Sequence, residues 1–136
     1  MKKLTREWVR KAEADHVMAN ALSLLAPPVH DGVCFHCHQG VEKYLKALLV
    51  ELGLPVPKTH DLDHLLTSLQ PHHPTLRSLR RGLLILNDYA VDTRYPSNWT
   101  NKRQAKAALR WGDRVRTAAR SLLGIVSRPR RLRKSP

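Results

Sequence analysis

The chain has 136 residues, of which 24 are lysine or arginine and 11 are aspartate or glutamate, for a formal charge of +13. This length suits one domain, and a hydrophobic share of 42% is too high for a disordered chain. Two cysteines cannot form a disulfide framework, and no apolar run reaches the roughly 20 residues that span a bilayer. We therefore expect a soluble, cytoplasmic protein, without a membrane segment, that has an anionic partner.

Apolar residues recur at three- and four-residue steps along most of the chain, which is typical of amphipathic helices. Thr5 and Thr100 are the expected N-caps of the first and last helices, and Gly53 is the expected C-terminal cap of the second. No segment alternates with period two, so the predicted fold is an all-α, up-and-down bundle of four longer helices and one short one. The helices are expected over about 5–26, 31–52, 60–69, 75–92 and 100–125.

The bundle is predicted to form a single domain over residues 1–126. The remaining segment, 127–136, holds five basic residues, two prolines and no acidic residue, so we expect a disordered tail. Its charge favours phosphate binding without sequence preference, or else it only keeps the chain in solution. Residues 101–123 add seven basic residues against the single acid Asp113, so most of the excess charge lies beyond residue 100.

One carboxylate, Asp15, lies on the otherwise apolar face of the first predicted helix. A carboxylate in that position needs a partner, because an unpaired buried charge is costly. Asp15 is therefore either a hydrogen-bonding anchor or part of a functional site.

The segment Cys34-Phe35-His36-Cys37-His38 has C-x-x-C spacing beside two histidines. Cys34 and His38 lie one helical turn apart and could bind zinc with His60 and His64 if the fold brought the two pairs together. A redox motif would need a thioredoxin-like context of strand and helix, which the pattern lacks. Buried cysteine in a core is the commoner outcome, so we predict no metal site.

Polar residues interrupt the second predicted helix at Gln39, Glu42, Lys43 and Lys46. They form either a solvated face or a site, and the spacing of Glu42 and Lys46 suits a helix ion pair. Another candidate, His60, stands near a helix start, where free backbone N–H groups favour phosphate.

Arg94 follows the fourth predicted helix and precedes an aromatic residue and a proline, Tyr95-Pro96. Its guanidinium could bind a phosphate bidentately, or it could simply pair with Asp92 or Asp15.

In their order and spacing these elements resemble the HEPN family of helical nucleotide-binding domains. A first helix with a tryptophan and an inward Asp15 precedes C-F-H-C-H-Q-G-V-E-K-Y-L-K-A-L-L at 34–49, T-H-D-L at 59–62 and D-T-R-Y-P at 92–96. The resemblance covers roughly residues 4–125. It implies a five-helix bundle that forms a homodimer and pairs with a minimal nucleotidyltransferase, often as a toxin–antitoxin system.

Many members of that family are metal-independent RNases with an R-x4-6-H motif at the dimer cleft. There the histidine moves protons and the arginine steadies the phosphate charge. Counted from Arg94, the permitted histidine positions hold Trp99, Thr100 and Asn101, none of which is a general base near neutral pH.

The resemblance therefore implies a protein that binds a nucleotide or an RNA phosphate, with no catalytic residue and no cofactor. Arg94 would hold the phosphate, the lysines would supply charge, and Tyr95 or Trp99 would stack on a base. Two alternatives remain: an RNase toxin with an atypical residue set, or a non-catalytic protein-interaction module. The expected site residues are Arg94, Lys43, Lys46, His60, Tyr95, Gln39 and Glu42.

Overall fold

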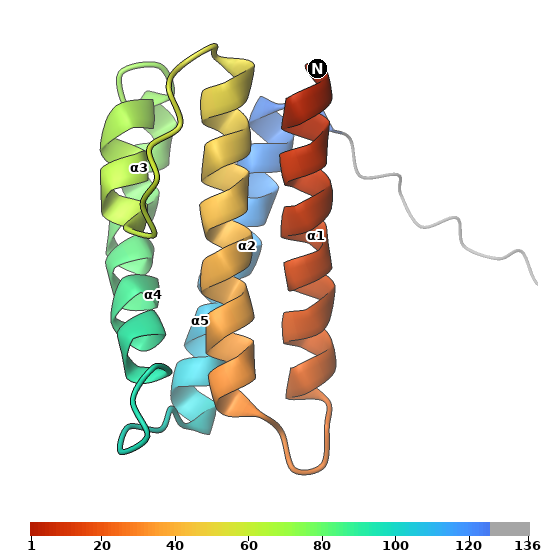
Figure 1. The fold of residues 1–136 in the computed structure, drawn as a ribbon, viewed down its shortest axis with the longest axis vertical. Coiled ribbons are helices and arrows are strands. Elements are labelled where there is room, and N and C mark those ends of the chain that lie inside the picture. The colour runs from red at the N-terminus through yellow and green to blue at the C-terminus, as the bar shows by residue number, and fades with distance from the viewer. Residues whose placement is uncertain (126–136) are drawn as a thin grey trace, which may run out of the picture.

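The computed structural model describes residues 1–125, which form an up-and-down helical bundle (Figure 1). The predicted all-α fold is confirmed, and these residues contain no strand. The elements in chain order are α1 (Lys3–Ser23), α2 (His30–Glu51), α3 (Leu62–Leu69), the 3-10 helix η1 (Pro74–Leu79), α4 (Arg80–Asp92) and α5 (Lys102–Leu122).

Helix α2 is the centre of the bundle. Figure 1 shows it between α1 on one side and α3 with α4 on the other, with α5 behind, and it packs against all four helices. From Gly40 to Leu49 every residue of α2 except Lys43 is buried, as expected for a helix surrounded by others. Any charged side chain in this stretch therefore needs a partner from a neighbouring element.

Two glycines allow close helix contacts. A Cβ atom on Gly40 of α2 would lie 3.4 Å from the Ala12 carbonyl oxygen of α1. A Cβ on Gly82 of α4 would lie 2.0 Å from the Trp111 ring of α5, so this ring packs directly on the α4 backbone. These contacts fix α1 and α5 against the layer of α2 and α4.

The two predicted N-caps have other roles. Helix α1 already includes Thr5, which is buried, and its hydroxyl donates to Glu51 Oε1 at 2.9 Å. Thr100 is also buried, and its backbone N–H donates to Asp31 Oδ1 at 2.8 Å. Asn101 caps α5 instead, through a capping box with Gln104. Both threonines thus join distant helices rather than capping their own.

Several helix ends also differ from expectation. The first helix ends at Ser23 rather than Ala26, and the predicted fourth helix begins as the 3-10 segment η1. Gly53 follows α2 in the left-handed conformation, with φ +72°, as its predicted capping role requires. Gly124 adopts the same conformation, with φ +71°, and this ends α5 before Ile125.

The predictions for the tail, 127–136, lie outside the described residues. Within residues 1–125, no helix combines the length and the apolar character that crossing a membrane requires.

Candidate functional site

Asp15 joins α1 to α2. Its side chain is 8% exposed, and its two oxygens accept from His36 Nδ1 at 2.8 Å and Lys43 Nζ at 2.5 Å. The prediction that this inward carboxylate needs a partner is confirmed. Lys43, one of the predicted phosphate-binding residues, is thereby held against Asp15.

Glu42 forms a second charged cluster on α2. Its side chain is 5% exposed and lies 3.2 Å from Lys46 Nζ, and Lys46 itself is 9% exposed. The ammonium of Lys46 also lies 5.6 Å from the centroid of a Trp8 ring on α1. The interpretation of these residues as a solvated face is therefore wrong for Glu42 and Lys46, because both side chains are buried.

The other oxygen of Glu42 lies 2.7 Å from Nδ1 of His60, in the segment between α2 and α3. The His60 side chain is 67% exposed, so its ring reaches solvent while one nitrogen is fixed by a buried carboxylate. A carboxylate at Nδ1 orients the ring and favours the tautomer that leaves Nε2 as an acceptor.

A third network surrounds Asn87 of α4. The side-chain oxygen of Asn87 lies 3.3 Å from Nε2 of the buried His38 and accepts from the Leu62 N–H at 3.1 Å. Its amide nitrogen donates to Asp61 Oδ1 at 2.8 Å, and Asp61 is the N-cap of α3. Burial lowers the pKa of His38, against the opposing effect of Glu42, so this ring is neutral at pH 7.

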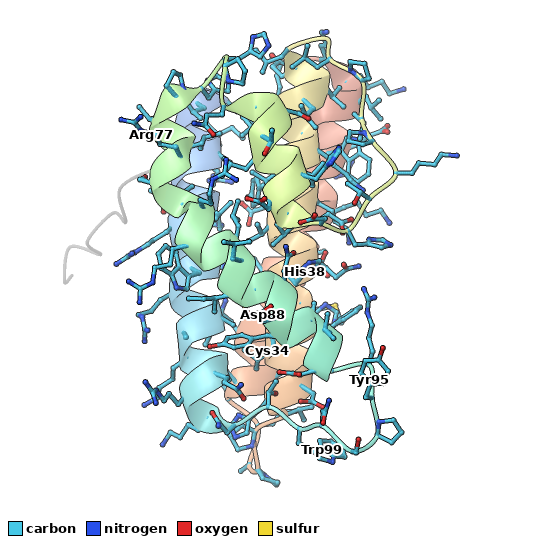
Figure 2. The ribbon with its side chains drawn as sticks, turned by 90° about the vertical axis from the view of Figure 1, so that its left-hand side faces the viewer. Cys34, His38, Arg77, Asp88, Tyr95 and Trp99 are labelled. Atoms are coloured by element: carbon cyan, nitrogen blue, oxygen red, sulfur yellow. The ribbon has the colours of Figure 1, made fainter. Side chains whose placement is uncertain are left out.

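An open groove of about 410 Å3 lies beside this network; we call it the Arg94 groove. Figure 2 faces this side of the molecule, where Asp88 of α4 lies beside His38 of α2. The groove is lined by His38, His60, Asp61, Asp63, Leu84, Asn87, Asp88, Ala90, Val91 and Arg94.

The groove has one cation and several acceptors. Among the described residues Arg94 makes no ion pair, so neither Asp92 nor Asp15 holds it. Asp63 is neutralised by Arg80. The groove therefore presents a free guanidinium together with carboxylate and amide oxygens.

The structure brings some of the predicted site residues together and separates others. His60 and Arg94 line the same groove, and Glu42 reaches it through His60. Lys43 and Lys46 do not line it. Gln39 is half-buried and adjoins His38 on α2.

Two aromatic residues stand on the loop after α4. Tyr95 is 56% exposed and Trp99 is 78% exposed. Figure 2 shows both at the same end of the molecule, below Asp88. Neither lines the groove itself; Tyr95 directly follows Arg94 in the chain, and Trp99 lies five positions after it.

Asn87 and Asp88 are functional candidates that no motif in the sequence indicates. They directly follow the apolar run 83–86 of α4, and this change from apolar to polar residues is the signal that the sequence offers. Their roles depend on α3 and the preceding loop, which pattern reasoning does not position.

Cys34 and Cys37 are free and buried. Burial raises the pKa of the Cys34 thiol to about 11 and that of Cys37 to about 12, as the core-packing interpretation predicts. Within residues 1–125, no group of three histidine, cysteine, aspartate or glutamate side chains is arranged to hold a metal ion.

Comparison with known proteins gives two findings. The model of the HEPN domain family matches residues 5–122. The crystal structure of TT1696 from Thermus thermophilus is similar, with a TM-score of 0.77 and 22% identity, over 88% of this chain and 98% of that one. At that identity the likeness concerns the fold alone, and no curated protein matches the chain. Since the family match spans nearly the whole bundle, the chain belongs to the HEPN domain family.

Proposed function

We propose that this HEPN protein binds a nucleotide, or a phosphate of RNA, in the Arg94 groove. The observation that supports this most is the exposed Arg94 guanidinium, unpaired within residues 1–125, in a groove of about 410 Å3. That volume lies within the range of small-molecule sites. Arg94 holds the phosphate bidentately, and Asp88 and Asp61 accept hydrogen bonds from ribose hydroxyls or base amino groups.

The other predicted residues surround this contact. Tyr95 and Trp99 offer exposed rings on which a base can stack. His60 forms a polar wall, together with Gln39 and Glu42. Lys43 and Lys46 contribute positive potential from outside the groove, reduced by their ion pairs.

Family membership supports the rest of the proposal. The protein acts in the cytoplasm as a homodimer and partners a minimal nucleotidyltransferase, as in toxin–antitoxin pairs. It does not cleave RNA, because positions 99–101 lack the histidine that the R-x4-6-H motif requires.

Arg94→Ala is expected to weaken ATP binding by at least tenfold. A hydrogen bond to a charged group contributes roughly 1.5–3 kcal/mol, which corresponds to about a 10- to 100-fold change. Calorimetric titration of both proteins with ATP and with a short RNA measures the change. The control is Arg6→Ala, which removes an exposed arginine on α1 and should leave binding unaltered. Absence of ATP binding in the wild type, or equal affinity in the Arg94 variant, removes the site assignment.

A second candidate, a metal-independent RNase, is favoured by one observation. Glu42 orients His60, and His60 shares a groove with Arg94, so a proton-transfer group and a phosphate-binding group occur together despite the missing motif. The preferred proposal predicts that RNA stays intact during incubation with the purified protein. Cleavage that persists in EDTA and disappears in both Arg94→Ala and His60→Gln would establish the RNase instead. A protein that neither binds nor cleaves RNA or nucleotides would fit the interaction module.

A further inference from the structure

Helix α5 carries a row of cations along its outer face. The row, which we call the basic row, consists of Arg103, Lys106, Arg110 and Arg114, all of which are exposed. Steps of three or four residues place these side chains on one side of the helix, and a rise of about 1.5 Å per residue gives the row a length of about 17 Å. Asp113 is the only acidic residue of α5.

The remaining arginines of α5 have a different role. Arg116 donates from Nε to Glu13 Oε2 at 2.9 Å, and Arg120 bonds to the same carboxylate. These two side chains tie α5 to α1. In contrast, within residues 1–125 no member of the basic row makes an ion pair. The ion pairs that hold α5 against α1 are therefore made by Arg116 and Arg120, and the basic row takes no part in them.

The basic surface extends from α5 to the start of α4. The Arg114 guanidinium carbon lies 4.7 Å from the Trp111 ring centroid, and the same ring packs on Gly82. Arg81 adjoins Gly82 and is exposed, as is Arg77 of η1, which Figure 2 shows at the edge along which α5 runs. Residues 74–87 contain no acidic residue. The basic row, Arg81 and Arg77 therefore belong to one positively charged side of the bundle.

We propose that this surface binds the phosphate backbone of a nucleic acid, independently of the Arg94 groove. Arginine suits phosphate because its planar fork donates two parallel hydrogen bonds. Cations that recur every turn of a helix contact successive phosphates without reading bases, so the interaction depends on salt and not on sequence.

An acidic protein is the less suitable partner for this surface. Stable protein interfaces centre on buried aromatic or aliphatic anchors. On α5 only Leu122, at the far end, is an exposed large hydrophobic residue. Trp111 is partly buried against Gly82 and covered by Arg114. A surface of cations without an apolar anchor fits a polyanion of evenly spaced charges.

The test is a full-length variant with Arg103→Gln, Lys106→Gln and Arg110→Gln. Arg114 is kept, because it covers the Trp111 ring. Fluorescence anisotropy with a labelled 20-nucleotide single-stranded RNA gives the affinity at several salt concentrations. We expect at least a tenfold loss of affinity at about 0.1 M salt, and a decrease of about 2 in the slope of log K against log salt, since each phosphate contact contributes about 0.7. A DNA strand of the same sequence should behave alike.

A charge-matched variant provides the control. Lys3→Gln, Arg6→Gln and Arg10→Gln remove three exposed cations from α1, and none of the three is in an ion pair within residues 1–125. This variant should keep the affinity and the salt slope of the wild type. Equal losses of RNA affinity in the two variants would show that only net charge matters. An α5 variant with unchanged RNA affinity would show that the basic row does not contact RNA. Either result overturns the proposal.

Two further measurements separate the remaining possibilities. If polyglutamate binds as tightly as RNA and responds equally to the α5 substitutions, the surface belongs to an acidic protein and the proposal fails. ATP affinity should not change in the α5 variant, because the groove lies elsewhere. If the wild type does not bind ATP, the groove assignment fails, but the RNA result for the α5 surface still stands. Thermal melting of each variant checks that it is folded.

Discussion

The Glu42→Gln variant is expected to lose about 3 kcal/mol of unfolding free energy. Removing one partner of a buried ion pair typically costs about 3–5 kcal/mol, because the other charge stays buried and uncompensated. Here that charge is Lys46, which is 9% exposed. Its position over the Trp8 ring retains part of the stabilisation, which places the expected loss at the lower end of that range.

Urea denaturation at pH 7 measures the loss, and the melting temperature should fall by about 10 °C for a chain of this length. The double variant Glu42→Gln/Lys46→Met supplies the comparison. It should be more stable than Glu42→Gln alone, since no uncompensated charge is left in the bundle. A double variant that is less stable than the single one would contradict this account of the cluster.

The positions of the helices could be predicted from the sequence, and their first residues could not. Apolar periodicity is a local property, and it placed all five helices. Thr5 and Thr100 are good caps by residue type, yet each bonds to a carboxylate far away in the chain, Glu51 and Asp31. The choice between a local cap and a distant partner depends on packing that a local pattern does not contain.

In the candidate site too, contacts within one helix could be predicted from the sequence, and contacts between distant segments could not. Helical spacing predicted that Glu42 and Lys46 would pair, but it did not predict their contacts with other segments, which are Trp8 of α1 for Lys46 and His60 for Glu42. His60 and Arg94 are 34 positions apart, and they share a groove because the segment after α2 returns along α3 (Figure 1). Residues 53–57 of that segment include one glycine and two prolines. They show no helical periodicity, so the sequence does not predict the path of the segment.

Glu13 is the residue whose importance the sequence did not indicate. It looks like an ordinary surface glutamate of α1, yet it binds Arg116 and Arg120 of α5, more than 100 positions later. Elsewhere α1 packs mainly on α2 and only lightly on α5. Glu13 is therefore the main polar link between the first and last helices of the bundle.

Glu13→Gln is accordingly expected to destabilise the protein by about 2 kcal/mol. The loss is smaller than for Glu42, because the Arg116 and Arg120 side chains are 31% and 18% exposed and water partly compensates them. Chemical denaturation of the variant measures it. Asp113→Asn is the matched control: Asp113 is 65% exposed and lies 3.8 Å from His16, so its loss should stay within about 0.5 kcal/mol.

The pH dependence of the stability difference between wild type and Glu13→Gln identifies the cause of that difference. Burial raises the pKa of Glu13, but the hydrogen bond from Arg116 and the charges of Arg116 and Arg120 outweigh burial, so the pKa is lowered from its ordinary 4.5. A lowered carboxyl pKa stabilises the folded state above the unfolded pKa, and this contribution is lost as the pH falls through the folded pKa. The stability difference between wild type and Glu13→Gln should therefore be constant from pH 6 to 8, at about 2 kcal/mol, and should shrink below about pH 4.5. A difference that persists unchanged in acid would mean that the variant acts through packing and that the link between α1 and α5 is not ionic.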